Sequence, residues 1–473
     1  MKTITMKFGG TSVGSPEAIQ NVVGIVQAAY EQGNRVVVVV SAMSGVTDYL
    51  LESVRLAEKS DKWGYLSLSQ KIRDQHDEAI NRLISPGVLR DQTHHRIQKL
   101  LEKHVELCDA INILGDATPR VIDSVVSLGE RMSSKLVAAA LKAHGLDAEA
   151  LDAGKLLITD DTFQNAMPNW QETEKRVQEQ LLPRLKSGII PVITGFIGAT
   201  PDGTYTTLGR GGSDYSAAIF AAYVDSDEFI IWTDVDGVMT TDPRLDKRAR
   251  VLPHISYQEV GEMAFYGAKV VHPKTVQPIL NKGIPIWVRN TFNPNSPGTL
   301  ITDEIRESAT VIKAVTHVRN ISMLTVSGAG MLGVPGIAGR TFLATAKAGA
   351  SILMISQASS EQSFCFTVPD EKAQAVKAAV EDELRAEINH KNVDGVHILQ
   401  DVVIVTVVGA GMRGTPGVAG RVFTTLGNHN INVLAIAQGA SECSISFVID
   451  EKDLKNAVIQ LHDLALETVT NGI

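Results

Sequence analysis

The last third of the chain repeats itself, and this repeat constrains the fold more than any other feature of the sequence. Residues 328–368 align without a gap on residues 409–449, at the offset of 81 residues that separates Gly328 from Gly409. Each copy reads as strand, Gly/Pro loop, helix, strand, turn, strand and helix. The pattern therefore predicts two copies of one small α+β module.

Both copies contain the motif G-x-G-x-x-G after a strand, which is typical of dinucleotide-binding sites. Three observations disfavour that function. Pro335 and Pro416 interrupt the run from the third glycine into the helix. Gln357 and Gln438 stand where an acidic residue would be needed, and each unit is too short for a full dinucleotide domain. We therefore expect these glycines to shape a turn or an effector loop; the repeat resembles tandem ACT domains, which bind free amino acids at their interfaces.

From Met1 to about Thr302, apolar strand-like runs alternate with helical patterns, which predicts an α/β domain with a largely parallel sheet. Residues 48–114 are charged and helix-periodic, and predict a helical excursion from the sheet. Residues 290–298 are dense in Asn, Pro, Ser and Gly, and predict a turn-rich boundary or interdomain passage. The predicted strands are 3–8, 35–41, 189–194, 229–233 and 284–288, and the predicted helices are 19–30, 133–144, 172–186 and 214–223.

Charge and composition exclude several classes of protein. The net charge is −9 and no basic stripe is present, which argues against binding to nucleic acid or to an anionic membrane. The apolar run 36–40 is too short to cross a bilayer, and no signal peptide opens the chain. Cys108, Cys365 and Cys443 lack metal-ligand spacing and read as reduced thiols. We expect a cytoplasmic protein without a metal site of its own.

Two glycine-rich segments, 7–12 (KFGGTS) and 207–214 (TLGRGGSD), predict phosphate sites. Glycines let backbone N–H groups approach a phosphate, and Lys7 adds a positive charge. Ser12 and Ser213 are expected to cap helices whose N-termini favour negative charge. Neither the P-loop motif nor the protein-kinase motifs are present, so the chain handles phosphate in another way.

Six segments stand in order along the first domain: KFGGTSVG (7–14), SAMSGVTD (41–48), SLGERMSS (127–134), TLGRGGSDYSA (207–217), WTDVDGVMTTDPR (232–244) and FYGAKVVHP (265–273). With the ACT-like repeat, they closely resemble the aspartokinases, of the amino-acid-kinase fold, over essentially the whole chain. The resemblance implies a three-layer αβα kinase domain with a mostly parallel sheet at residues 1–303. Two ACT-like βαββαβ modules are expected at 304–395 and 396–473.

The resemblance also implies a reaction, the transfer of the ATP γ-phosphoryl group to the β-carboxylate of L-aspartate. The product would be 4-phospho-L-aspartate, made in the first step towards lysine, threonine and methionine. A carboxylate is ionised at neutral pH, so no general base is needed. Catalysis then consists of bringing two anions together and neutralising charge. The Mg²⁺ that accompanies ATP is expected to be held mainly by the phosphates.

Lys7 is the best candidate to contact the γ-phosphoryl oxygens, because it ends an apolar strand directly before two glycines. Asp214 would orient Lys7 or assist the phosphate-bound Mg²⁺, although it can equally stabilise the first turn of its helix. Lys269 would be a second phosphate clamp, with a snorkelling lysine as the alternative. The family's other nucleotide-binding positions fall on Gly9, Gly10, Thr233, Asp234 and Arg244. Met239 stands where the family commonly has Tyr.

The amino group and carboxyl group of the substrate need partners of opposite charge. Arg210, between glycines, suits bidentate capture of the α-carboxylate. Glu130 suits the α-ammonium, with an ion pair to Arg131 as the alternative. The resemblance adds three hydroxyls to the substrate site, those of Ser41, Thr47 and Ser213.

The repeat carries Gln357 and Gln438 at matching places, and we expect both to contact an effector. The pattern Gln-x-Ser-Ser-Glu resembles threonine-responsive aspartokinases, so L-threonine is the expected inhibitor. Glu361 and Glu442 leave L-lysine open, and Ala440 departs from the pattern. We expect a homodimer or a dimer of dimers; the alternative is a repeat that serves only in dimerisation.

Other functions remain open at this point. The same fold can phosphorylate glutamate, N-acetylglutamate or a nucleoside monophosphate. A catalytically inactive amino-acid sensor would lack Lys7, Arg210 or Asp214, and all three are present. A nicotinamide-dependent dehydrogenase would rest on the glycine motifs alone. Because the sequence stops soon after the second repeat, we expect a monofunctional kinase.

Overall fold

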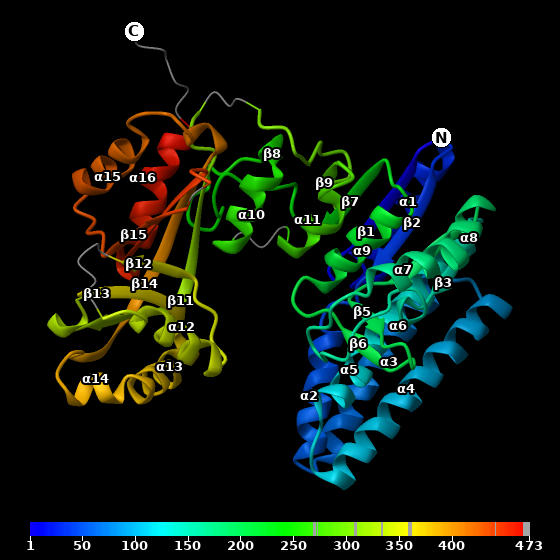
Figure 1. Cartoon of the computed structure of the whole chain (residues 1–473). Helices are drawn as coiled ribbons and strands as arrows, with labels where there is room; N and C mark the ends of the chain where they lie inside the picture. Colours follow the sequence, from blue (N-terminus) through cyan, green and yellow to red (C-terminus); the bar gives the residue numbers. More distant parts are fainter. Residues whose placement is uncertain are drawn as a thin grey trace. The chain divides into compact units, whose positions relative to one another are not determined.

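The computed structural model describes residues 1–267, 271, 273–306, 310–332, 334–357, 362–439 and 441–466. The chain forms two compact units (Figure 1). Unit 1 comprises residues 1–238, 253–257 and 270–304, and unit 2 comprises residues 239–252, 258–269 and 305–473. The domain boundaries expected from the sequence stay predictions.

Within its described residues, unit 1 contains an eight-stranded sheet in the order β3-β4-β2-β1-β7-β9-β10-β8. Neighbouring strands run parallel except for the pair β9–β10, which confirms the predicted α/β class. The valines 36–40 are buried on both faces, as is usual in a parallel sheet. The strands are β1 (Thr3–Phe8), β2 (Arg35–Val40), β3 (Ala148–Leu151), β4 (Ile190–Thr194), β7 (Glu228–Thr233), β8 (His254–Ser256), β9 (Ile286–Asn290) and β10 (Thr299–Thr302).

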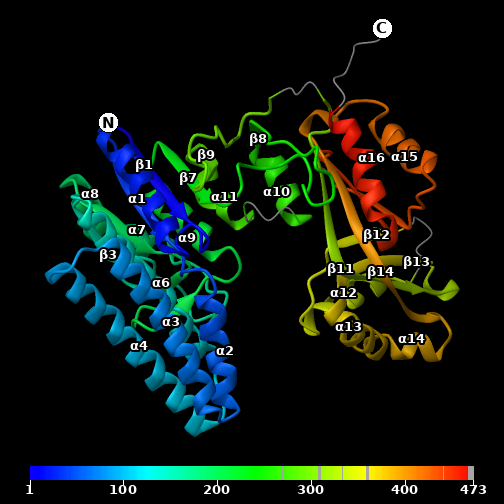
Figure 2. The ribbon, with the colours of Figure 1, turned by 180° about the vertical axis from the view of Figure 1, so that it is seen from behind.

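The predicted helical excursion is confirmed: four helices, α2 to α5, follow β2 in the described chain, and α2, α3 and α4 run alongside one another (Figure 2). The remaining helices of unit 1 alternate with the strands. Between residues 290 and 298 the chain turns from β9 into β10. The helices are α1 (Pro16–Glu31), α2 (Val46–Glu58), α3 (Lys62–Leu83), α4 (Val88–Leu114), α5 (Pro119–Val126), α6 (Leu128–Ala143), α7 (Trp170–Arg176), α8 (Leu182–Lys186), α9 (Gly212–Tyr223) and α11 (Pro273–Leu280).

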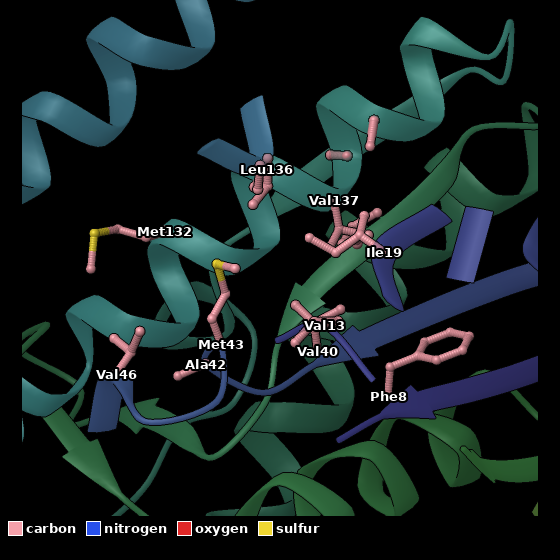
Figure 3. Close-up of a cluster of buried hydrophobic side chains, with 14 of the residues drawn as sticks. Phe8, Val13, Ile19, Val40, Ala42, Met43, Val46, Met132, Leu136 and Val137 are labelled. Atoms are coloured by element: carbon pink, nitrogen blue, oxygen red, sulfur yellow. The ribbon is translucent and has the colours of Figure 1, made fainter. Parts of the chain in front are cut away.

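The main core of unit 1 lies where the ends of β1 and β2 meet α6. Figure 3 shows Val40 between Phe8 and Met43 in this view, with Met132 and Val137 on α6. All five side chains are at most 1% exposed. This packing fixes the ends of two central strands, from which the glycine-rich loop and the 41–45 loop depart.

The two predicted helix caps are wrong. Helix α1 is capped by Ser15, whose side chain accepts a hydrogen bond from the Ala18 N–H, and not by Ser12. Ser12 is buried and bonds to the Thr291 hydroxyl at 2.7 Å. Helix α9 begins after Gly211, whose positive φ of +74° lets the chain turn into the helix without a side-chain cap. Ser213 therefore lies inside the first turn.

The described part of unit 2 forms a six-stranded antiparallel sheet in the order β12-β13-β11-β14-β16-β15. Each copy of the repeat supplies strand, helix, two strands and helix, as predicted, and the first copy adds a second short helix, α14. The first copy contains β11 (Ala314–Ser327), α12 (Ile337–Lys347), β12 (Met354–Gln357), β13 (Ser363–Pro369), α13 (Asp370–Glu383) and α14 (Arg385–Asn389). The second contains β14 (Gly395–Val408), α15 (Val418–Asn428), β15 (Ala435–Gln438), β16 (Ser444–Asp450) and α16 (Leu454–Leu466). Helix α10 (Tyr257–Phe265) also belongs mainly to this unit.

The long strands β11 and β14 hold the two copies together. They pair along most of their length, and the register shifts between Val318 and Ile321. Asn320 and Asp401 take positive φ angles of +58° and +55° at matching positions of the repeat. Each long strand therefore bends midway and pairs with one copy on each side of the bend.

The first glycine of each G-x-G-x-x-G motif is explained by packing. A Cβ atom on Gly328 would lie 2.2 Å from the Asn392 carbonyl oxygen, and one on Gly409 would lie 2.2 Å from that of Val311. Only glycine allows such an approach of two backbones. This supports the interpretation of these glycines as structural. Among the described helices, none has the length and apolar character that crossing a bilayer requires.

Candidate active site

The parallel strands of unit 1 bring four loops to one edge of the sheet. Lys7 is the next-to-last residue of β1, Ser41 follows β2, Phe196 follows β4, and Thr233 ends β7. The carboxyl edge of such a sheet is the usual place for a ligand. The described part of unit 1 has two cavities there, of about 680 and 490 Å³. They adjoin, because both are lined by Ser41, Thr47, Phe196 and Ser213.

Lys7 and Asp214 form an ion pair in the wall of the larger cavity. The Lys7 Nζ and Asp214 Oδ1 atoms are 2.6 Å apart, and both side chains are largely buried. Lys7 is held on the central strand β1, and Asp214 lies in the first turn of α9. This contact joins residues 207 positions apart and places the Lys7 cation beside the N-terminus of α9. Both groups favour a negatively charged ligand at this point of the cavity.

Gly9 and Gly10, which the sequence predicts to approach a phosphate, line the smaller cavity. The Gly9 N–H donates to the Trp232 carbonyl oxygen at 3.2 Å. A Cβ atom on Gly10 would lie 3.2 Å from the Ala42 carbonyl oxygen, so a larger residue would push apart the loops after β1 and β2. Thr233 and Asp234 line the same cavity.

Glu130 also lines the smaller cavity, from the first turn of α6. Its Oε1 atom accepts a hydrogen bond from the Ala42 N–H at 3.2 Å, whereas Oε2 is buried and has no partner among the described residues. Burial raises the pKa of this carboxyl to about 7. The alternative ion pair with Arg131 is absent, because Arg131 pairs with Asp152 at 3.2 Å. The Oε2 atom of Glu130 is thus available to a ligand, and an ammonium group would supply both a hydrogen bond and a positive charge.

Arg210 lines the larger cavity from the loop before α9. Its neighbours Gly209 and Gly211 both have φ angles of +74°, so the loop needs glycine on each side of the arginine. The side chain is exposed, and within the described chain it makes no ion pair. A guanidinium group in this position is available to a carboxylate ligand.

Not every predicted site residue lies at these cavities. Arg244 belongs to unit 2, where its exposed guanidinium pairs with Asp242 at 2.7 Å. Met239 also belongs to unit 2, in an isolated pairing with Val251. Lys269, Glu361 and Ala440 lie outside the described residues. Gln357 ends β12 and Gln438 ends β15, and both side chains are exposed.

The structure adds residues to the site that the sequence did not suggest. Phe196, with a positive φ of +66°, lines both cavities. Asp123 and Gln164 line the larger cavity. Only the glycine before Phe196 could have marked a sharp turn. Asp123 stands in an amphipathic helix, where an acidic residue usually faces solvent, so no local signal distinguished it.

Comparisons with known proteins identify the family of the chain. The model of the amino acid kinase family matches residues 2–290, and the ACT domain model matches residues 324–384 and 405–464. The bifunctional aspartokinase/homoserine dehydrogenase 1 of Arabidopsis thaliana is 38% identical over 476 residues, which cover 99% of this chain and 52% of that protein. The chain therefore spans about half the length of the bifunctional relatives that it matches.

Solved structures match over the whole length. The structure of E. coli aspartokinase III in complex with aspartate and ADP has a TM-score of 0.83 and 31% identity, and covers 98% of this chain and 100% of that chain. The structure of the same enzyme in complex with lysine and aspartate has a TM-score of 0.79 and 31% identity, and covers 99% and 100% of the two chains.

Proposed function

The chain belongs to the amino acid kinase family, as an aspartokinase with C-terminal ACT domains, and from this premise we propose that it phosphorylates the β-carboxylate of L-aspartate with ATP. The observation that carries the proposal is the set of charges around the adjoining cavities. Among the described residues, Glu130 has one buried oxygen without a partner and Arg210 is a cation without an ion pair, and Lys7 adds a second cation. An amino acid with an acidic side chain matches this set, and a similar enzyme binds aspartate and ADP.

In the proposed mechanism, Glu130 binds the α-ammonium of aspartate and Arg210 its α-carboxylate, with hydroxyls of Ser41, Thr47 and Ser213 as further contacts. The β-carboxylate oxygen attacks the γ-phosphorus of ATP, and the bond from that phosphorus to the β,γ-bridging oxygen breaks. ADP leaves with the electron pair, and no proton is transferred. Lys7 neutralises charge on the transferred group, and Asp214 holds Lys7 in place.

The phosphates of ATP are proposed to lie along Gly9 and Gly10, with Thr233 and Asp234 beside the nucleotide. Mg²⁺ bound to the phosphates supplies further charge neutralisation, and Asp214 offers a carboxylate of the type Mg²⁺ prefers. We propose Lys269 and Arg244 as further nucleotide contacts on the resemblance alone.

Trapping with hydroxylamine tests the function directly. The full chain, given MgATP and L-aspartate, is expected to form aspartyl hydroxamate together with an equal amount of ADP. L-Glutamate, N-acetylglutamate and uridine monophosphate serve as alternative acceptors. ADP formation with one of these, and none with L-aspartate, would overturn the proposal.

The pH dependence of aspartate binding tests the role of Glu130. Because the pKa of its carboxyl is raised to about 7, the group is protonated below pH 7 and must ionise to bind an ammonium. Aspartate affinity is therefore expected to fall up to about tenfold per pH unit below pH 7. In the ligand-free protein, the raised pKa also makes the free energy of unfolding depend on pH. The contribution of Glu130 to this free energy is complete below pH 4.5, the ordinary pKa of the group, and is lost as the pH rises through about 7.

Calorimetry at pH 6.5 in two buffers of different ionisation enthalpy measures this linkage. Binding of aspartate is expected to release about three-quarters of a proton, the fraction of Glu130 that is protonated at this pH, and the Glu130→Gln variant is expected to release none. Equal proton release from both proteins would show that another group titrates.

We further propose that an amino acid binds to the ACT repeat and inhibits the kinase, with L-threonine favoured over L-lysine. Gln357 and Gln438 are exposed at the ends of matching strands, and a glutamine amide can bind a carboxylate or a hydroxyl. A similar enzyme binds lysine, which makes lysine the alternative. The strands β12 and β15 end the sheet and expose Ile355 and Ile436, which favours a homodimer or a dimer of dimers.

The two copies differ in what covers their glycine loops, which favours the first copy as the effector site. In the second copy, Glu259 of α10 accepts a hydrogen bond from the Ala410 N–H at 2.7 Å, and Glu262 accepts one from the Ser444 hydroxyl at 2.8 Å. Carboxylates of the chain itself thus occupy this loop. The matching Ala329 N–H has no such partner among the described residues.

The trapping assay also tests this regulation when threonine or lysine is added. We expect threonine to suppress hydroxamate formation, and Gln357→Ala to raise the inhibitory concentration at least about tenfold. The matched Gln438→Ala variant is expected to change it less than about twofold. Equal effects of both variants would assign the effector to both copies, and no suppression by either amino acid would reduce the repeat to a structural role.

A further inference from the structure

Asp123 is a buried carboxylate in the wall of the larger cavity, and the proposed mechanism does not use it. It lies in α5 and is 1% exposed. Its Oδ2 atom accepts hydrogen bonds from the backbone N–H groups of Gln164 and Thr207, both at 2.9 Å, and Oδ1 accepts one from the Thr207 hydroxyl at 2.8 Å. Within the described residues no cation pairs with it, so these three donors are the groups that stabilise its charge.

These hydrogen bonds join two segments that are 43 positions apart. Thr207 ends β6 (Tyr205–Thr207), three residues before Arg210. Gln164 lies in a turn with a φ of +68°, a conformation that costs free energy for any residue with a side chain. The Ala166 N–H also donates to the Thr207 carbonyl oxygen at 2.9 Å. Asp123 thus holds a strained turn against the strand that leads to Arg210.

The glycine before Arg210 packs against the same turn. A Cβ atom on Gly209 would lie 3.0 Å from the Gln164 carbonyl oxygen and 3.0 Å from Asn165 Oδ1. The position of this turn therefore limits where Gly209 can lie. Asp123, Gln164, Gly209 and Arg210 all line the larger cavity, so the bonded segments form the wall from which Arg210 extends.

We infer that Asp123 is a positioning residue that places Arg210 for the carboxylate of the amino acid substrate, acting through Thr207 and Gly209. This inference rests on the proposed function of Arg210. An ionised carboxylate suits the role because it accepts from three donors at once. An amide at this position would turn its NH₂ group towards an N–H or O–H donor and lose at least one hydrogen bond.

Steady-state kinetics of the Asp123→Asn variant test the inference. The KM for aspartate is expected to rise about tenfold, whereas the KM for ATP stays within about twofold of the original value. If Asp123 acts through Arg210, Asp123→Asn is expected to add less than about twofold to the KM for aspartate in an Arg210→Ala background. Circular dichroism establishes that each variant is folded.

Asp160→Asn is the matched control, because Asp160 makes similar bonds on the other side of the same turn. It accepts from the Met167 N–H at 2.8 Å and from the Thr162 hydroxyl at 2.9 Å, and it lines neither cavity. This variant is expected to leave both KM values within about twofold. Should Asp123→Asn fail to fold, Thr207→Val removes only the hydroxyl bond, and a rise of about threefold in the KM for aspartate is expected.

The outcomes separate this inference from the proposed function. No hydroxamate from the unaltered protein would overturn the function itself. Hydroxamate from the unaltered protein, together with an unchanged KM for aspartate in Asp123→Asn, would overturn only the role of Asp123. An equal rise of the KM for aspartate in Asp123→Asn and Asp160→Asn would show that Asp123 serves only the structure of the turn. Equal rises of the KM for aspartate and the KM for ATP in Asp123→Asn would show the same.

Discussion

Replacing Lys7 by alanine is expected to lower the kcat for aspartate phosphorylation by about 10²–10³-fold, because the substitution removes a fixed charge aimed at the transferred group. Lys7 Nζ lies 2.6 Å from Asp214 Oδ1, and the lysine is the next-to-last residue of β1, a central strand of the sheet. Its position therefore depends little on the ligand. The measurement is kcat at saturating MgATP and aspartate.

Stability must be separated from catalysis in this experiment. Lys7→Ala leaves the largely buried Asp214 without its partner, so the variant is expected to be less stable than the unaltered protein. A Lys7→Met, Asp214→Asn double variant removes both charges, and is expected to regain stability while remaining inactive. Lys2→Ala is the control, since Lys2 forms an exposed ion pair with Glu228 away from both cavities. A double variant with more than a tenth of the original kcat would show that Lys7 is not catalytic.

Five of the eight strands in the sheet of unit 1 could be predicted because their signals are local, whereas the short strands β3, β8 and β10 were missed. The strand 3–8 and the helical excursion after β2 follow from apolar runs and helical periodicity, and their bounds agree closely with the structure. The pairing of Lys7 with Asp214 came from the resemblance, since residues so far apart show no shared pattern. The caps at Ser12 and Ser213 were wrong because Ser15 precedes Pro16, a strong helix start, and Gly211 supplies the turn before α9.

Other features depend on contacts that no local pattern records. The bend at Asn320 and Asp401, where each long strand changes partners, follows from strand pairing across the repeat. Asp123 is bonded to residues 41 and 84 positions away. The carboxylates of α10 on the second copy likewise break the symmetry of the repeat through tertiary contacts. The sequence therefore named charged residues that line the two cavities, but not the contacts that hold those residues in place.

Arg210 is expected to have the largest effect on aspartate binding. A charge-assisted, bidentate pair contributes about 1.5–3 kcal/mol, so Arg210→Ala is expected to raise the KM for aspartate by about 10–150-fold. Because Arg210 lines the larger cavity, whereas Gly9 and Gly10, the proposed phosphate contacts, line the smaller one, the KM for ATP is expected to change less than about twofold. Initial rates with each substrate varied in turn measure both values.

Two further variants define what Arg210 does. Arg210→Lys keeps the charge but loses the planar, two-pronged donor, so an intermediate KM for aspartate is expected. Arg120→Ala is the control, since Arg120 bonds to the Thr204 hydroxyl at 3.0 Å and lines neither cavity. A KM for ATP that rises as much as that for aspartate would place Arg210 on the nucleotide instead. Its freedom from any ion pair would then reflect a phosphate ligand, and the carboxylate of the amino acid would need another cation.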